Sequence, residues 1–229
     1  MRLPLRCGIA KTGRAQLNGC QLGDLGSLGM SGKTTEGRTE VSPVHLSRRG
    51  GVLVIALAHQ PVNALSAELR AGVLEGLAAA QDPEIKAVVI ASDIAQFSAG
   101  TDMAELGRKD AGFGLAQLCA AVEDFPKPVV VAINGNAMGG GLELALAAHA
   151  RVAEDKAHLG LPEVSLGILP SAGGTQRLPR IVGAAAALKI LLETAPLSAA
   201  QALTVGLLDQ VVGTGLRDAA CALALALAT

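Results

Sequence analysis

Short, wholly apolar runs alternate along the chain with longer segments whose apolar residues recur at helical spacing. The first run, at residues 52–58, follows a charged, glycine-rich stretch and is typical of a buried strand. Leu69, Val73 and Leu77 then lie on one stripe of a helix that we predict over residues 66–81. Similar patterns predict strands at 86–91, 128–133, 150–153 and 209–212, and helices near 114–124, 140–149, 173–181, 184–193 and 199–205.

This alternation of strands and helices indicates the α/β class. Strand–helix–strand units at such spacing are typical of parallel crossover connections, and strands that are apolar on both faces predict a sheet covered on both sides. The helix predicted at 199–205 begins with a capping box, in which the Ser198 hydroxyl caps the first turn and Gln201 reaches back to the Ser198 amide. The 229 residues fit one domain, and we expect it to begin near residue 44.

The first 50 residues differ from the remainder in charge. They hold eight Lys and Arg against three acidic residues, whereas the rest of the chain holds 11 against 17. A basic, glycine-rich segment without helical periodicity is typical of an unstructured tail. We therefore predict a disordered extension over residues 1–43 and a folded domain over residues 44–229. A nucleic-acid-binding arm and a transit peptide have similar compositions and stay open as alternatives.

Deletion of residues 1–43 is expected to leave folding and activity unchanged, because this segment has too few periodic apolar residues to offset the entropy lost on ordering it. Thermal unfolding of the shortened chain is the measurement. A fall of many degrees in the melting temperature would show that the segment docks on the domain.

The composition excludes several classes of function. With no Trp, no Tyr and only three Phe, the chain lacks the aromatic platforms on which bases stack, so no nucleic-acid partner is expected. No apolar run reaches the roughly 18 residues of a membrane span, so no membrane partner is expected.

The four cysteines form no CxxC pair and no signal peptide is evident, which favours reduced thiols and a cytoplasmic location. In a eukaryote, a mitochondrial or peroxisomal location is the alternative. The histidines have no metal-ligand spacing, so we predict no metal.

Two turns rich in small residues, at 97–102 and 134–143, each follow a predicted strand. Such turns expose backbone N–H groups near a helix N-terminus, where a substrate oxygen can approach closely, and two of them can converge on one oxyanion. Tight packing of a helix on the sheet is another interpretation of the glycines at 139–141, and it is compatible with the first. For Asp102 we favour helix capping, supported by Glu105 three residues later.

Two lone carboxyl groups lie in apolar surroundings near these turns. Glu143 is in the first turn of a helix made otherwise of Leu and Ala, and Glu163 is the only acid in the apolar segment 159–169. Each could be a helix-dipole or surface residue. Their occurrence twenty residues apart, beside an oxyanion-type turn, favours paired acid–base catalysis, because burial raises the pKa of a carboxyl group towards the working range.

Several ordered motifs now resemble one family. They are residues 61–66 (PVNALS), 97–102 (FSAGTD), 127–135 (KPVVVAING), 139–143 (GGGLE), 161–163 (LPE) and 173–178 (GGTQRL). Residues 52–212 are similar to the crotonase (enoyl-CoA hydratase/isomerase) superfamily, and most similar to the N-terminal hydratase part of bifunctional enoyl-CoA hydratase/3-hydroxyacyl-CoA dehydrogenases. The resemblance implies a spiral of β-β-α units, which refines the simpler crossover prediction.

The resemblance also implies roles for particular residues. Glu143 and Glu163 would be the paired catalytic acids, and the amides of Ala99 and Gly140 would bind the thioester oxygen. The implied substrate-binding residues are Ala64, Leu65, Ala99, Gly100, Thr101, Asp102, Gly139, Pro162 and Ser171. The substrate would be an acyl-CoA thioester without a separate cofactor. Relatives tend to form trimers or are fused to a dehydrogenase.

The chain departs from the family pattern in three places. Ser171 replaces a glycine whose amide usually faces the catalytic water, and a positive φ there would cost roughly 1 kcal/mol. Residues 60–62 lack the basic residue that many relatives carry there, which weakens the expected binding of CoA phosphate. Family members continue beyond the 210–212 segment through further helices, whereas this chain stops at Thr229. We therefore expect a truncated product with weak solubility and reduced turnover.

These observations lead us to expect an enoyl-CoA hydratase that adds water to trans-2-enoyl-CoA. Members that only move a double bond usually lack the equivalent of Glu143, so the presence of both acids favours hydration. Δ3–Δ2 enoyl-CoA isomerisation by Glu163 is the enzymatic alternative. A non-catalytic, truncated acyl-CoA-binding fragment is the alternative from another class.

Overall fold

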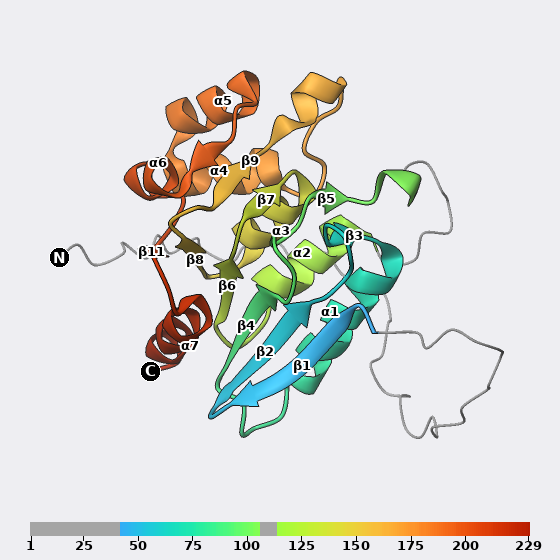
Figure 1. Ribbon diagram of the computed structural model, residues 1–229, viewed down its shortest axis with the longest axis vertical. Coiled ribbons are helices and arrows are strands. Elements are labelled where there is room, and N and C mark those ends of the chain that lie inside the picture. Colours follow the sequence, from blue (N-terminus) through green and yellow to red (C-terminus); the bar gives the residue numbers. More distant parts are fainter. Residues whose placement is uncertain (1–41, 106–113) are drawn as a thin grey trace, which may run out of the picture. The chain divides into compact units, whose positions relative to one another are not determined.

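A computed structural model describes residues 42–105 and 114–229 and has a six-stranded sheet at its centre (Figure 1). The strand order is β1-β2-β4-β6-β8-β11. β1 is antiparallel to β2, and the other neighbours in the sheet are parallel. The bounds are β1 Val44–Arg49, β2 Val52–Leu57, β4 Ala87–Ser92, β6 Val129–Ile133, β8 Ala150–Glu154 and β11 Gln210–Val212.

Helices cover both faces of this sheet because its central strands are apolar on both sides. α7 (Leu216–Leu227) packs on one face, where Val54, Val89 and Val130 meet Ala220 and Ala224. The other face lies under α1 (Ala67–Ala79), α2 (Leu115–Glu123) and α3 (Gly140–Ala147). All six residues of β2 and of β4 are buried. The predicted sheet with both faces covered is thus confirmed.

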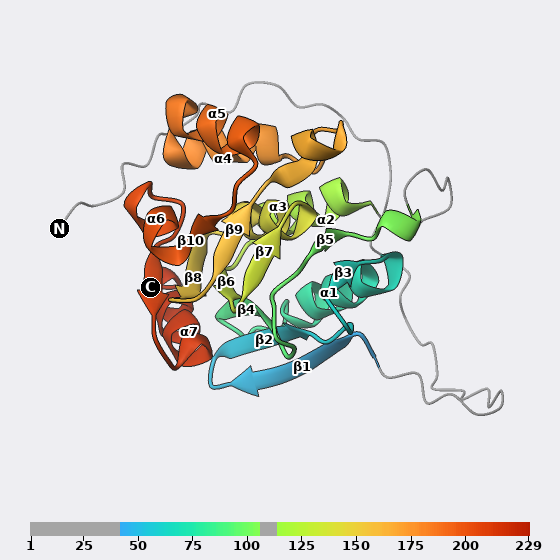
Figure 2. The same cartoon turned by 45° about the horizontal axis from the view of Figure 1, so that its top comes forward.

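Two smaller sheets lie beside the central one (Figure 2). β7 (Asn136–Met138), β9 (His158–Gly160) and β10 (Leu197–Ser198) form one of them, and β3 (Ala64–Leu65) pairs with β5 (Gly100–Thr101) in the other. The remaining elements are the 3₁₀ turns η1 (Met103–Glu105) and η2 (Pro162–Leu166) and the helices α4 (Gly174–Val182), α5 (Ala184–Glu193) and α6 (Ala199–Thr204).

The α/β class and the β-β-α spiral implied by the family resemblance are both confirmed. The strands β2, β4, β6 and β8 are each followed by a short one, as in β2–β3–α1 and β6–β7–α3. The predicted parallel connections between these long strands are present. The prediction lacked the short strands, because two- and three-residue strands leave no apolar run in the sequence. The strands β2, β4, β6, β8 and β11 and the helices α1 to α6 agree with their predicted ranges to within two residues, and the capping box of Ser198 and Gln201 is present. No strand was predicted at β1 and no helix at α7.

The described contacts of the domain begin two residues before the predicted boundary. The Ser42 hydroxyl donates to the Val44 carbonyl, and the Pro43 carbonyl accepts a hydrogen bond of 2.8 Å from the Ala58 amide. A deletion that ends at residue 41 therefore keeps both contacts and is the better version of the truncation experiment. The rest of the predicted extension lies outside the described residues.

Residues 42–105 and 114–229 contain neither a membrane-spanning helix nor a cluster of metal ligands. No helix there has the length and apolar content needed to cross a bilayer. No three His, Cys, Asp or Glu side chains gather there as metal ligands could. Cys119 and Cys221 are both free and buried, whereas Cys7 and Cys20 lie outside the described residues.

Candidate active site

A cavity of about 410 Å³ lies among β5, the start of α3, η2 and the segment that leads into α4. It brings together segments that are far apart in the sequence. The predicted site residues that line it are Ala99, Gly100, Thr101, Gly139, Gly140, Glu143, Pro162, Glu163 and Ser171. Leu166, Ile168 and Leu169 add an apolar wall that the sequence reasoning did not assign to the site.

Glu143 is held in the first turn of α3, a helix in which every residue is buried. The carboxyl group is 2 % exposed, and its Oε1 accepts hydrogen bonds of 2.8 Å from the amides of Ala172 and Gly174. Burial raises the pKa of Glu143, while the two amides and the nearby Arg177 guanidinium oppose this increase. Glu143 is therefore a desolvated carboxyl group whose charged form is partly supported by directed donors.

Glu163 lies in η2 and faces the same cavity with a different environment. Its Oε2 is buried and has no hydrogen-bond partner among the described residues. Burial raises the pKa of Glu163, a hydrogen bond from its own backbone amide opposes this increase, and the neighbouring Glu143 raises the pKa further. A Cβ on Gly139 would lie 3.2 Å from Glu163 Oε1, so the glycine permits this close approach. The surroundings of Glu163 thus favour a neutral, protonated carboxyl group.

The two turns rich in small residues, at 97–102 and 134–143, converge at the cavity. A Cβ on Gly140 would lie 3.2 Å from the Thr101 amide nitrogen, and one on Gly100 would lie 3.2 Å from the Gly140 amide nitrogen. The Gly140 and Thr101 amides therefore adjoin at the N-terminus of α3, where the helix dipole favours negative charge. Gly139 has a φ of 51°, a conformation that glycine adopts easily.

The role predicted for Ala99 requires a correction. The Ala99 amide donates a 2.9 Å hydrogen bond to the Val62 carbonyl and is not available to a thioester oxygen. Gly100 follows with a φ of +106°, which changes the direction of the next peptide unit. The amide that adjoins Gly140 is consequently that of Thr101, two residues further along the chain.

Three predicted substrate-binding residues do not line the cavity. Ala64 and Leu65 form β3, which pairs in parallel with β5, and the Leu65 side chain is fully buried. Asp102 Oδ1 accepts from the Ala104 amide and thus caps η1. The capping interpretation of Asp102 is confirmed, but Glu105 does not complete a capping box, because its carboxylate binds the Ala67 amide and Arg70 instead.

The strain considered for Ser171 is absent. Among the described residues, only Asn63 and Thr194 combine a side chain with a positive φ. The left-handed position in this segment is Gly173, with a φ of +106°. Ser171 lies at the cavity without backbone strain, so its conformation removes no stability from the site.

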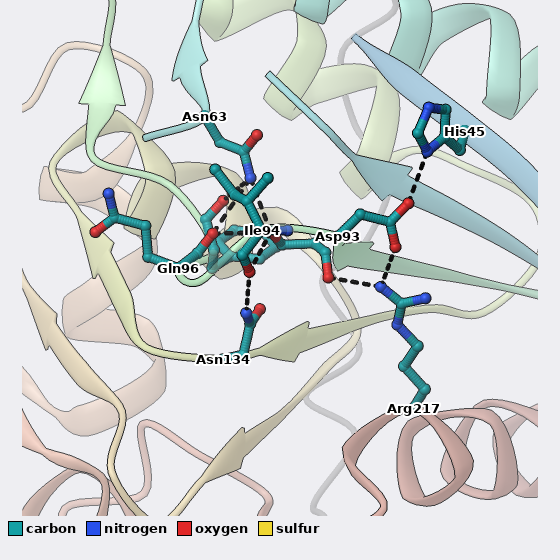
Figure 3. A network of polar contacts seen from close by, with 9 residues as sticks. His45, Asn63, Asp93, Ile94, Gln96, Asn134 and Arg217 are labelled. Atoms are coloured by element: carbon teal, nitrogen blue, oxygen red, sulfur yellow. Dashed lines mark hydrogen bonds and ion pairs between the residues drawn. The ribbon is translucent and has the colours of Figure 1, made fainter. Parts of the chain in front are cut away.

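A polar network fixes the loop that connects β4 to the first turn of the site (Figure 3). Asn63 is fully buried, and its Nδ2 donates to the Ser92 hydroxyl and to the carbonyls of Gln96 and Phe97 at 2.9–3.2 Å. At the end of β4, Arg217 binds the Ser92 carbonyl and the Asp93 carboxylate. This network was not predictable from local sequence patterns, because the bonded residues Ser92 and Arg217 are 125 residues apart.

Replacing Asn63 with Ala is expected to lower the free energy of unfolding by roughly 3 kcal/mol, because several buried polar groups lose their partners. Chemical denaturation measures this change. Asn136→Ala is the matched control, since Asn136 is exposed and makes one long contact of 3.4 Å with Gln96; it is expected to cost less than about 0.5 kcal/mol. Equal losses in the two variants would contradict this account of the loop.

The fold and site now define the class of protein. A comparison with known families matches residues 47–228 to "Enoyl-CoA hydratase/isomerase", and the chain belongs to this family within the crotonase superfamily. The resemblance predicted from the motifs is thus confirmed.

Individual relatives agree with this assignment. The peroxisomal bifunctional enzyme of Danio rerio is 48% identical over 161 residues, which cover 70% of this chain and 22% of that protein. A probable enoyl-CoA hydratase of Bacillus subtilis is 42% identical over 182 residues, which cover 74% of this chain and 67% of the relative. The crystal structure of enoyl-CoA hydratase from Bacillus anthracis superposes with a TM-score of 0.76 at 32% identity, covering 81% of this chain and 76% of that one. The chain thus spans about a fifth of the length of the bifunctional relatives and about two thirds of the length of the Bacillus subtilis relative.

Proposed function

We propose that this domain adds water to trans-2-enoyl-CoA thioesters and forms 3-hydroxyacyl-CoA by syn addition. The observation that supports the proposal most directly is the pair of buried carboxyl groups, Glu143 and Glu163, on one cavity beside the adjoining amides of Thr101 and Gly140. Hydration of an enoyl thioester develops negative charge on the carbonyl oxygen. Two fixed amide donors can stabilise that charge by several kcal/mol, on the order of the effect of other oxyanion holes.

The environments of the two carboxyl groups suggest different roles. Glu143 accepts two amide hydrogen bonds and lies near Arg177, which supports its ionised form and suits a general base. Glu163 Oε2 is buried without a hydrogen-bond partner among the described residues, and Glu143 lies nearby. Both features support the protonated form of Glu163, which suits a general acid.

In the proposed reaction, water attacks C3 of the enoyl group while its proton moves to Glu143. The electron pair of the double bond passes towards the thioester oxygen, which the amides of Thr101 and Gly140 would bind. Glu163 then delivers its proton to C2, and the carbonyl is restored. The proton on Glu143 returns to Glu163 through the cavity, so the net change is addition of one water molecule.

The remaining predictions about the substrate stay proposals. The CoA portion is part of the substrate, and we propose no separate cofactor. Ala64, Leu65 and Asp102 would act behind or beside the channel rather than at the cavity wall. Trimer formation, fusion to a dehydrogenase and a cytoplasmic location also stay predictions; several relatives have "peroxisomal" in their names.

The proposal is tested by turnover of crotonyl-CoA, followed as the loss of enoyl-thioester absorbance. Enzyme-dependent loss with formation of 3-hydroxybutyryl-CoA supports hydration. Isomerisation, which the relatives' names do not favour, would instead convert a 3-enoyl-CoA into an absorbing 2-enoyl-CoA. Binding of butyryl-CoA without any turnover would contradict the proposal and indicate the non-catalytic alternative.

A further inference from the structure

Arg177 lies in α4 behind the segment that holds Glu143, outside the wall of the active-site cavity. Its side chain is 13% exposed. Nη1 donates to the Ala172 carbonyl at 2.7 Å, and Nη2 donates to the Glu123 carboxylate at 2.6 Å. A Cβ on Gly173 would lie 2.1 Å from Nη1, so the glycine leaves the space that the guanidinium occupies.

The same short segment binds both Arg177 and Glu143. The Ala172 amide donates to Glu143 Oε1 while the Ala172 carbonyl accepts from Arg177. The Gly174 amide supplies the second donor to the carboxylate, and the Arg177 amide donates to the Gly173 carbonyl at 2.8 Å. The segment 172–174 is thus held between a carboxylate on one side and a guanidinium on the other. Displacement of the guanidinium would free the segment and change the orientation of both donors to Glu143.

We propose that Arg177 is a positioning residue for hydration, which fixes the orientation and supports the charge of Glu143 through the 172–174 segment without contacting substrate. This inference rests on the proposed hydratase function. The inference gives Arg177 a role in the reaction, whereas the motif at 173–178 alone indicates only the start of a helix.

The charges around Glu143 are consistent with this role. Arg177 lowers the pKa of Glu143 against the larger effect of burial. The other titratable groups that act with Glu143 are Glu163 from η2 and Cys119 from α2. Burial raises the pKa of Cys119 to about 12, so this thiol is neutral at physiological pH. Arg177 is consequently the cation that offsets the burial of Glu143 among the described residues.

A purely structural role would be to tie α2 to α4 through the ion pair with Glu123. This role does not account for the whole arrangement, because Glu123 is 53% exposed and an exposed ion pair contributes little. Arg177 Nε is also buried without a hydrogen-bond partner in the described residues. The two roles separate experimentally, since Glu123→Gln removes the negative charge from the link between α2 and α4 but keeps the contact of Arg177 with Ala172.

Arg177→Gln is expected to lower kcat roughly 10- to 100-fold with little change in KM, because misplacement of a catalytic group affects the chemical step more than binding. The acidic limb of the pH profile is expected to move to higher pH, because Glu143 loses a supporting cation. Arg177→Lys is expected to recover part of the rate. Glu123→Gln is expected to stay within about threefold of the parent. Arg180→Gln is the matched control, since Arg180 is exposed on the same helix and, among the described residues, its side chain binds only the Gln176 carbonyl.

Carbon-13 NMR of labelled glutamate carboxyl groups provides a readout that does not depend on turnover. The Glu143 resonance is assigned by its loss in Glu143→Gln. It is expected to titrate at higher pH in the Arg177→Gln chain than in the parent, and at the parent's pH in the Arg180→Gln chain. An unchanged titration in the Arg177 variants, or equal rate losses in Glu123→Gln and Arg177→Gln, would overturn the inference. If the parent chain shows no hydration, the proposed function fails while the titration still decides the positioning of Glu143. If Arg177→Gln does not fold, Arg177→Lys is titrated in its place, and a smaller shift of Glu143 to higher pH is expected, because an ammonium group cannot keep both contacts of the guanidinium.

Discussion

Glu163→Gln is expected to remove hydration and isomerisation alike, whereas Glu143→Gln lowers hydration by roughly 100-fold or more and spares much of any isomerase activity. Isomerisation needs one carboxyl group, which removes a proton at one carbon and returns it at another. Hydration also needs a base for water, and Glu143 is the base that we propose. Rates with crotonyl-CoA and with a 3-enoyl-CoA measure the two reactions separately.

Both variants are expected to bind a saturated acyl-CoA as the parent does, because the amides of Thr101 and Gly140 are unchanged. The amide oxygen of glutamine at position 143 can still accept from Ala172 and Gly174, so the loop should keep its shape. Glu75→Gln, on the exposed side of α1, is the matched control. Near-normal hydration by Glu143→Gln would sink the paired mechanism and leave Glu143 as a helix-start carboxylate.

Gly100→Ala is expected to lower kcat by roughly 100- to 1,000-fold, the effect of losing an oxyanion donor. A Cβ at this position would lie 2.8 Å from the Met138 carbonyl and 3.2 Å from the Gly140 amide. The φ of +106° also strains any side chain, so the free energy of unfolding should fall by about 1–3 kcal/mol. Turnover and denaturation measurements on the same preparation separate the two effects.

Gly206→Ala is the control for backbone strain without a change at the site. Gly206 has a φ of +79°, and a Cβ there would meet nothing within 4 Å. This variant should lose about 1 kcal/mol of stability and keep the parent kcat. If Gly100→Ala behaves like Gly206→Ala, the amides of Thr101 and Gly140 are not the oxyanion donors.

The long elements were predictable from the sequence because their own residues determine them. Six consecutive buried residues in β2 leave a continuous apolar run, and Ser66 caps α1 where the periodic pattern begins. The short strands β3, β5, β7, β9 and β10 were not predictable, since they depend on pairing partners distant in the chain. The antiparallel β1 was missed for a related reason: five of its six residues are not buried and give no apolar signal.

The site was predictable in its chemistry but less so in its geometry. Glu143 and Glu163 stood out as lone acids in apolar segments, and both line the cavity. The turn at 97–102 lies at the cavity as expected, but the Ala99 amide predicted as a donor is bonded to Val62, because the direction of each amide depends on the φ of Gly100. Arg177 and Glu123 are 54 residues apart, and no local pattern links them.

The unpartnered oxygen of Glu163 has a consequence for the energetics of the whole fold. A carboxyl group whose pKa is higher in the folded state than in the unfolded chain binds its proton more tightly when folded. The contribution of Glu163 to stability is therefore fully present below the pKa of the unfolded chain and is lost as the pH rises through the folded-state pKa. The protonated form of Glu163, which would donate the proton in the proposed reaction, is thus also the form in which this residue adds to the stability of the fold. For this one group, the pH range in which it stabilises the fold and the pH range in which it is ready to donate coincide.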